Sequence, residues 1–125
     1  MPEPSIVAVM IHVASVADAI AWYSRAFPTA VRRTVPGTTF EYLAVGQTRL
    51  EFVPSDAKVA SGAAGTVVYW RVESFAQALA HFEAIGAQLY RGPLAIEAGE
   101  SMCQVRDPWG NCIGLRGPSG TRVTP

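Results

Sequence analysis

Four side chains that could hold or transform a small molecule fall on one face of a predicted β-hairpin. If Gly46-Gln47 forms a two-residue loop, Val45 lies opposite Thr48, and this fixes the register of the two strands. A surface that mixes aromatic and ionisable groups is typical of a ligand-facing wall. Because successive strand residues point to opposite faces, one face carries Phe40, Tyr42, Arg49 and Glu51. The opposite face, which suits a covering helix except at its first residue, carries Glu41, Leu43, Leu50 and Phe52.

Glu51 supports two interpretations. A carboxylate that faces an aromatic-walled cavity can act as a general base or bind a cationic or hydroxyl-bearing ligand. Alternatively, Glu51 pairs with Arg49, two residues away on the same face. Tyr42, directly opposite, is either the hydrogen-bond partner of Glu51 or a cover over the core. The residues alone leave these alternatives open.

His12 is a second candidate acid–base group, near the end of a predicted strand over residues 6–13. By alternation it shares a face with Ala8 and Met10. It either hydrogen-bonds or exchanges protons with a ligand, or it is a structural or solvated histidine at the strand end. Cys103 and Cys112 belong to no C-x-x-C pair and are expected to be thiols without a catalytic role.

The composition excludes several classes of protein. With 125 residues, half of them apolar, the chain is one domain or two small halves that share a core. Ten basic residues balance ten acidic ones, which argues against nucleic-acid binding. Residues 1–4 lack the features of an export signal, and no apolar run approaches the roughly 18 residues of a membrane span. We therefore expect a cytoplasmic protein.

An internal repeat organises these residues. The segment 13–23 aligns with 72–82, with identical residues at one Val, one Ser (Ser15 over Ser74) and three Ala positions, and with Tyr23 over Phe82. Each serine is followed at the third residue by Asp18 or Gln77, which predicts a capped helix start. Apolar residues then recur at helical spacing, and the helices are predicted to end before residues 28 and 86.

Each predicted helix lies between strands. The first strands cover residues 6–13 and 66–72. The later strands of the two halves cover residues 30–34, 38–45 and 48–53, then 88–91, 101–106 and 111–115, with a break at Gly92-Pro93. This order predicts an α+β protein of two tandem βαβββ modules within a single domain over residues 1–125. Module one spans about 5–55, a linker 56–65, module two about 66–118, and a loose tail 119–125.

The repeated motif Val-x-Ser-x-Ala-Asp-Ala-x-Ala-Trp-Tyr at residues 13–23 and the turn Arg-Asp-Pro-Trp-Gly-Asn at residues 106–111 carry a family resemblance. Over about residues 5–118 the chain resembles the glyoxalase/bleomycin-resistance/dioxygenase superfamily, also called vicinal oxygen chelate proteins. The resemblance implies that the two modules form a curled, cup-shaped mixed sheet. It also implies a homodimer.

The resemblance further implies four positions for metal ligands, which are His or Glu in the metal-dependent members. In this chain those positions carry Ala8, Glu51, Val67 and Gly114. Three of the four side chains cannot coordinate an ion, and a lone carboxylate does not hold iron, nickel or zinc in an open site. We therefore expect no catalytic metal and no cofactor.

Three further residues are candidate ligand contacts. Alternation from Val67 puts Tyr69 and Arg71 on the cup face. Arg71 either receives an anionic ligand or forms an ion pair with Glu73 or another acid. Trp109 stands where the family commonly has a small polar residue, and it provides either a stacking surface or a dimer contact.

We expect a glyoxalase/bleomycin-resistance-like protein, closer to the metal-free bleomycin-resistance branch, that binds a small organic ligand in an aromatic-lined cup without a catalytic metal. The neutral charge argues against a cationic drug as that ligand. The alternative is a lyase, isomerase or dioxygenase-type enzyme of the same superfamily, with Glu51 and His12 as acid–base groups or with an atypical metal site. The expected partners are a small-molecule ligand and a second copy of the chain, with no nucleic acid and no membrane.

Overall fold

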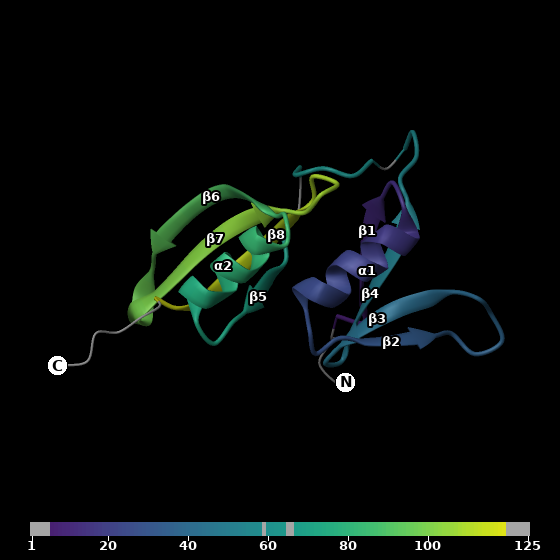
Figure 1. Cartoon of the computed structure of the whole chain (residues 1–125), viewed down its shortest axis with the longest axis horizontal. Coiled ribbons are helices and arrows are strands. Elements are labelled where there is room, and N and C mark those ends of the chain that lie inside the picture. The colour runs from purple at the N-terminus through teal and green to yellow at the C-terminus, as the bar shows by residue number, and fades with distance from the viewer. Residues whose placement is uncertain (1–5, 59, 65–66, 120–125) are drawn as a thin grey trace, which may run out of the picture. The chain divides into compact units, whose positions relative to one another are not determined.

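The structure is a computed structural model that describes residues 6–58, 60–64 and 67–119. The chain divides after Ser61 into two compact units, and each of them contains a strand, a helix and three further strands (Figure 1). This confirms the predicted α+β fold of two βαβββ modules. All but the first residue of the predicted tail 119–125 lies outside the described residues, as does position 66 of the predicted fifth strand.

Unit 1 is a four-stranded mixed sheet with one helix packed on it. Its elements are β1 (Ala8–Val13), α1 (Val16–Ala26), β2 (Val31–Thr34), β3 (Glu41–Val45) and β4 (Thr48–Pro54). The strand order is β1-β4-β3-β2, with β1 parallel to β4 and the other neighbours antiparallel. The predicted hairpin register is confirmed by the pairs Leu43–Leu50, Ala44–Arg49 and Val45–Thr48.

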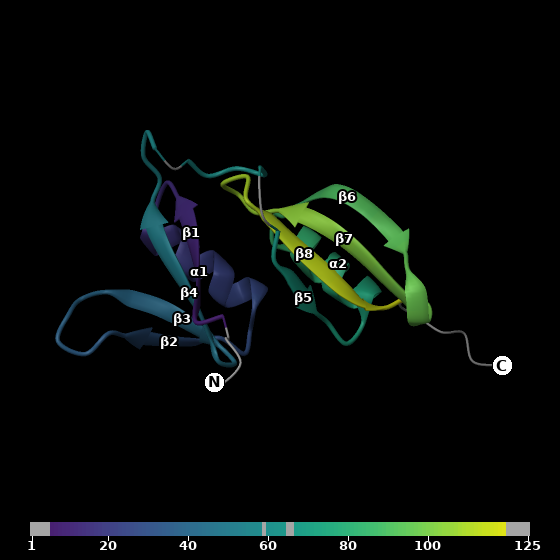
Figure 2. The same cartoon turned by 180° about the vertical axis from the view of Figure 1, so that it is seen from behind.

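Unit 2 repeats this arrangement. Its elements are β5 (Tyr69–Arg71), α2 (Phe75–Ala84), β6 (Gln88–Ala95), the short 3-10 helix η1 (Glu97–Gly99), β7 (Glu100–Arg106) and β8 (Cys112–Pro118). The strand order is β5-β8-β7-β6, with β5 parallel to β8. Seen from behind, the strands of each unit lie in front of its own helix (Figure 2).

Both helices begin directly after the predicted capping serine. The Ser15 hydroxyl accepts a hydrogen bond from the Asp18 N–H at 3.3 Å, and the Ser74 hydroxyl accepts one from the Gln77 N–H at 3.4 Å. Each bond satisfies a backbone donor that has no partner inside the helix. Neither of the two α-helices in the described ranges is long and apolar enough to cross a membrane.

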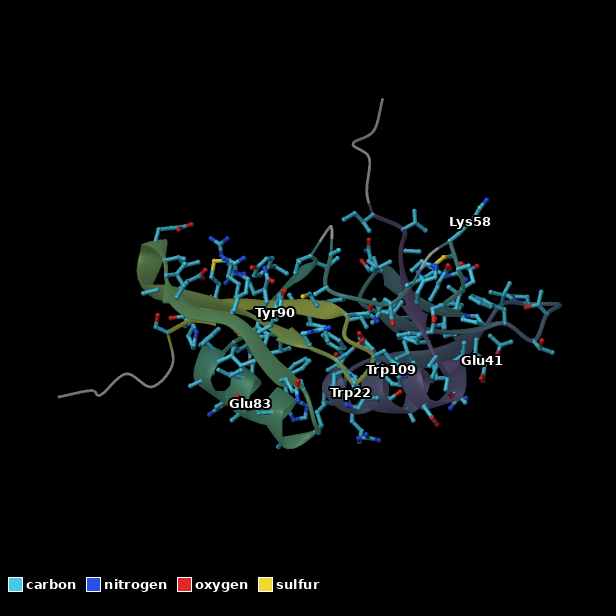
Figure 3. All side chains as sticks on the ribbon, turned by 90° about the horizontal axis from the view of Figure 1, so that it is seen from above. Trp22, Glu41, Lys58, Glu83, Tyr90 and Trp109 are labelled. Atoms are coloured by element: carbon cyan, nitrogen blue, oxygen red, sulfur yellow. The ribbon has the colours of Figure 1, made fainter. Side chains whose placement is uncertain are left out.

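The core of each unit lies between its helix and one face of its sheet. In unit 1 the Tyr23 and Phe52 rings meet with their centroids 4.8 Å apart. In Figure 3, which draws all side chains, the label Trp22 identifies α1 and the label Glu83 identifies α2. The buried apolar residues of the sheets and helices are Val13, Ala19, Ile20, Trp22, Tyr23, Ala26, Leu43, Leu50 and Phe52 in unit 1, and Phe75, Phe82, Cys103, Val105, Ile113 and Leu115 in unit 2.

The predicted break at Gly92-Pro93 is wrong, because β6 runs through it to Ala95. β6 is the edge strand of its sheet and has a neighbouring strand on one side only. A proline, which has no backbone N–H, is therefore tolerated in it. The pairing with β7 shifts register on both sides of Arg91, which accommodates the irregular backbone. The last strand also continues beyond the predicted Leu115, to Pro118, because β7 pairs with it along its whole length.

The turn between β7 and β8 is organised by a buried carboxylate. Asp107 is 4% exposed, and its Oδ1 accepts hydrogen bonds from the N–H groups of Trp109 and Asn111, both at 2.8 Å. The Asn111 side-chain amide donates to the Asp107 Oδ2 at 3.2 Å. The Asn111 Oδ1 in turn accepts the Gly62 N–H at 2.9 Å. This turn therefore ties the start of unit 2 to the β7–β8 hairpin.

Candidate functional site

The predicted hairpin face of unit 1 carries a cluster of Tyr42, Arg49 and Glu51. The Arg49 Cζ lies 3.9 Å from the centroid of the Tyr42 ring, a cation–π contact. The Arg49 Nε lies 3.4 Å from the Glu51 Oε2, and the Glu51 side chain is 18% exposed. Of the two interpretations of Glu51, the structure therefore contains the pairing with Arg49. Tyr42 stacks under the guanidinium, an arrangement that neither sequence interpretation anticipated.

His12 and Glu51 point to the same side of the unit 1 sheet but are not register partners. In the parallel pairing of β1 with β4, Met10 is opposite Glu51, and His12 is opposite Val53. Residues in register share a face of the sheet, so Ala8, Met10 and His12 all lie on the face of the Arg49–Glu51 pair. Met10, whose side chain is 55% exposed, is thus the direct strand neighbour of Glu51.

Phe40 lines a different cavity from the one predicted. This cavity of about 660 Å³ lies on the α1 side of the unit 1 sheet, where its walls include Ile20 and Phe52. Glu41 is also part of the wall and accepts two hydrogen bonds from Arg32, at 2.8 and 3.2 Å. The hydrogen bond from Arg32 lowers the pKa of Glu41, which explains how a carboxylate is tolerated beside the helix-covered face.

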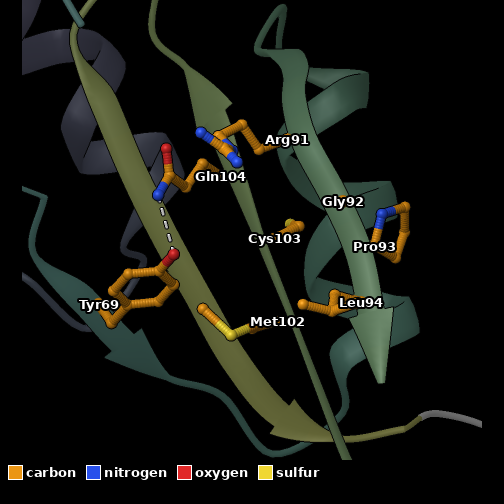
Figure 4. A pocket seen from close by; sticks show the side chains of 8 residues that line it. All are labelled: Tyr69, Arg91, Gly92, Pro93, Leu94, Met102, Cys103 and Gln104. Carbon is orange, nitrogen blue, oxygen red and sulfur yellow. Dashed lines mark hydrogen bonds between the residues drawn. The ribbon is translucent and has the colours of Figure 1, made fainter. Parts of the chain in front are cut away.

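Unit 2 contains a second cavity, of about 390 Å³, which sequence reasoning located only through Tyr69 (Figure 4). Four residues in register, one from each strand of the unit 2 sheet, lie side by side at this cavity. Tyr69 of β5 is opposite Gly114 of β8. Gly114 is opposite Gln104 of β7, which is opposite Arg91 of β6. The lining residues are Tyr69, Arg91, Gly92, Pro93, Leu94, Met102, Cys103 and Gln104.

The Tyr69 ring lies directly over Gly114. A Cβ atom at position 114 would come within 2.5 Å of the ring atoms Cγ and Cδ2, a separation that real contacts do not show. The Tyr69 hydroxyl accepts a hydrogen bond from the Gln104 Nε2 at 2.9 Å, which holds the ring in this position. Glycine at 114 is therefore what allows the aromatic wall of the cavity to form.

Arg71 forms an ion pair, the second of the two alternatives open to it. Its Nη1 lies 2.8 Å from Glu100, which also contacts Arg116 at 3.3 Å. Arg116 also forms an ion pair with Glu97 at 2.7 Å. In this cluster of unit 2, two arginines and two glutamates therefore neutralise one another's charge. The hydrogen bond from Arg71, with help from Arg116, lowers the pKa of Glu100. Arg71 is thereby engaged by protein groups.

Trp109 lines neither of the two cavities described above, and neither cysteine is chemically activated. Trp109 is half-buried in the β7–β8 turn, where its N–H donates to Asp107. Burial, reinforced by the charge of Glu83, raises the pKa of Cys103 to about 11. Burial also raises the pKa of Cys112. Both cysteines are free thiols that stay protonated at neutral pH, so neither is an activated nucleophile.

The four positions that the family resemblance assigns to metal ligands do not fit a metal ion in this chain. Ala8 and Val67 have no donor atom, and the space above Gly114 is filled by the Tyr69 ring. Glu51 is the remaining donor, and its carboxylate lies against Arg49. Within residues 6–58, 60–64 and 67–119, no three His, Cys, Asp or Glu side chains gather into a group that could hold an ion.

Sequence reasoning missed most of the unit 2 cavity. Arg91, Leu94, Met102 and Gln104 lie on two strands whose pairing changes register on both sides of Arg91. Simple alternation fails across such irregularities, because each extra residue moves the following side chains to the other face. The usable signal was Gly92-Pro93, which marks an irregular edge strand rather than a strand end.

The model of the Glyoxalase/Bleomycin resistance protein/Dioxygenase superfamily matches residues 5–115. No curated protein sequence matches the chain. Among solved structures, a glyoxalase/bleomycin resistance protein/dioxygenase family enzyme from Burkholderia phytofirmans PsJN is similar, with a TM-score of 0.72 and 17% identity, covering 89% of this chain and 96% of that one.

Two further structures share the fold. A member of the same superfamily from Sphaerobacter thermophilus DSM 20745 has a TM-score of 0.71 and 14% identity, covering 92% of this chain and 98% of that one. A lactoylglutathione lyase from Agrobacterium tumefaciens has a TM-score of 0.67 and 18% identity, covering 94% of this chain and 96% of that one. At these identities the likeness concerns the fold alone.

Proposed function

The chain belongs to the glyoxalase/bleomycin-resistance/dioxygenase superfamily, and on that premise we propose that it binds a small organic ligand without a catalytic metal. The observation that carries this proposal is the Tyr69 ring over Gly114, because aromatic surface takes the place of a metal ligand. The adjoining cavity of about 390 Å³ falls in the range of small-ligand sites, about 300–1,000 Å³. Within the superfamily, these features favour the metal-independent, bleomycin-resistance-like branch.

The acid–base alternative has less support. A general base and its acid partner need to converge on one substrate atom. Glu51 lies against Arg49, and its strand neighbour is Met10 rather than His12. We therefore assign Glu51 and Arg49 to the polar part of a binding surface, with Tyr42 stacked on it.

Metal titration tests the proposal. We expect the purified full-length protein to show no one-to-one binding of Ni²⁺, Zn²⁺, Mn²⁺ or Fe²⁺ with a Kd below about 1 µM in calorimetry, since three of the four positions lack donors. Glu41→Gln removes the same charge from an exposed ion pair and serves as the control. Tight binding that disappears in Glu51→Gln but persists in Glu41→Gln would overturn the metal-free function.

We also propose that the protein forms a homodimer. The edge strand β6 exposes the apolar side chains of Leu89 and Tyr90 at 41% and 48%, a surface that a second copy of the chain would cover (Tyr90 is labelled in Figure 3). Light scattering at micromolar concentration is expected to give the mass of a dimer, and Tyr90→Lys is expected to shift it toward the monomer. A monomeric wild-type protein would refute the dimer.

A further inference from the structure

The unit 2 cavity has a polar end and an apolar end. Arg91, Gln104 and the Tyr69 hydroxyl form the polar end, and Leu94 and Met102 lie toward the other end (Figure 4). Gly92 and Pro93 complete the wall next to Leu94, and no acidic side chain lines the cavity. Cys103, which alternates to the α2 face between Met102 and Gln104, is buried at 2% exposure and offers no thiol to a ligand.

Arg91 differs from the other described arginines of unit 2, because no described protein group pairs with its side chain. Among the four arginines within residues 67–119, Arg71 and Arg116 pair with glutamates. Arg106 donates to the Gly110 carbonyl at 3.1 Å and lies 5.3 Å from the centroid of the Tyr90 ring. The Arg91 side chain forms neither an ion pair nor a hydrogen bond with any described residue, although its backbone pairs with Gln104 of β7. Its fixed positive charge is therefore available to a ligand.

The Tyr69 hydroxyl supplies a second available donor. Gln104 donates its amide N–H to the Tyr69 oxygen at 2.9 Å, so that oxygen acts as the acceptor of the bond. The hydroxyl proton is then free to point elsewhere, and no described residue accepts it. Two donors without acceptors, Arg91 and Tyr69, thus line one cavity. A bound group with acceptor oxygens would satisfy both.

We infer that the unit 2 cavity binds the carboxylate of a small apolar acid. Arg91 holds the carboxylate through charge-assisted hydrogen bonds, and the Tyr69 hydroxyl donates to the same group. The apolar part of the acid packs on Leu94, Pro93 and Met102, where the flexible thioether adapts to ligand shape. This inference rests on the proposed metal-free binding function and narrows its ligand class.

The test compares acids with their neutral amides. Binding of 3-phenylpropionate and 3-phenylpropanamide, and of octanoate and octanamide, is measured by NMR titration of the full chain at low salt, up to about 10 mM. In the wild type, each acid is expected to bind about tenfold more tightly than its amide, the effect of a partly exposed charge-assisted hydrogen bond. Arg91→Gln is expected to remove this preference. The matched control Arg25→Gln removes one exposed positive charge from the last turn of α1, outside the unit 2 cavity and the Tyr42 face of unit 1, and is expected to keep the preference.

The outcomes separate this inference from the function on which it rests. Equal binding of acid and amide, or a preference that survives in Arg91→Gln, would overturn the role of Arg91 while leaving metal-free ligand binding intact. Binding of neither acid would overturn the proposed ligand class. The metal titration uses none of these probes and decides the metal-free function by itself.

Discussion

Replacing Gly114 with alanine is expected to lower the free energy of unfolding by about 2 kcal/mol, the usual cost of overpacking a buried site. The new methyl group would lie within 2.5 Å of the Tyr69 ring, so the ring must leave its position over the strand. The hydrogen bond from Gln104 to the Tyr69 hydroxyl would be lost with it. Chemical denaturation measures this change, and we expect the midpoint to fall while the m-value stays the same.

The effect of Gly114→Ala on the free energy of unfolding is expected to change sign when the Tyr69 ring is absent. In a Tyr69→Ala background the methyl group no longer meets the ring, and alanine is favoured over glycine within a strand by about 0.5–1 kcal/mol. Gly114→Ala should then be neutral or stabilising, which gives a coupling energy of about 2–3 kcal/mol between the two positions.

Tyr69→Phe is the control for this cycle, because it keeps the ring and removes only the hydroxyl. Gly114→Ala should still destabilise the Tyr69→Phe protein, by the wild-type cost less the roughly 1 kcal/mol of the Gln104 hydrogen bond that this background already lacks. If Gly114→Ala had the same effect in the Tyr69→Ala and wild-type backgrounds, the ring would not be what excludes a side chain at 114. The space above this strand would then be open to a metal ligand after all.

Replacing Asp107 with alanine is expected to cost about 3 kcal/mol of stability and to lower the Tm by roughly 10 °C. The buried carboxylate accepts three hydrogen bonds from Trp109 and Asn111, and its loss leaves those donors without a partner inside the turn. The Asn111 contact to Gly62 would loosen as well.

Two matched variants calibrate the Asp107 effect. Asp107→Asn keeps an acceptor oxygen for the backbone N–H groups and should cost about 1 kcal/mol. Asp56 makes a similar bond to the Lys58 N–H at 2.9 Å, but on an exposed loop, so Asp56→Ala should cost less than about 1 kcal/mol. A Tm for Asp107→Ala within 2–3 °C of that for Asp56→Ala, roughly 1 kcal/mol, would show that the turn is not a stabilising element.

Predictions from local patterns agreed with the structure where one short segment contains the whole signal. Ser15 and Ser74 cap the helices as expected, since a cap requires only a side chain and an N–H three residues later. The register of the β3–β4 hairpin follows from Gly46-Gln47, since a tight turn fixes which residues face each other. The strand through Gly92-Pro93 was missed because its position at the sheet edge is a property of the assembled sheet.

The candidate site was only half predictable. Tyr69, which was expected on the ligand-facing side, lines the unit 2 cavity, but Arg91 and Gln104 were not recognised as its neighbours. Phe40 was assigned by alternation to the face of Tyr42, and it lines the cavity on the α1 side instead. Alternation describes regular strands, and Phe40 lies just before β3 begins.

The sequence by itself determined the repeat, the order of elements, the helix caps, the family and the missing metal donors, because each depends on residue identity or on contacts a few residues apart. The tertiary structure alone decided which charges are neutralised and which remain available. Placing β8 between β5 and β7 brings Tyr69 over Gly114 and within reach of Gln104, whereas Arg71 reaches Glu100. These partners are distant in sequence and converge only when the strands pair, and this pairing leaves Arg91 available for a ligand.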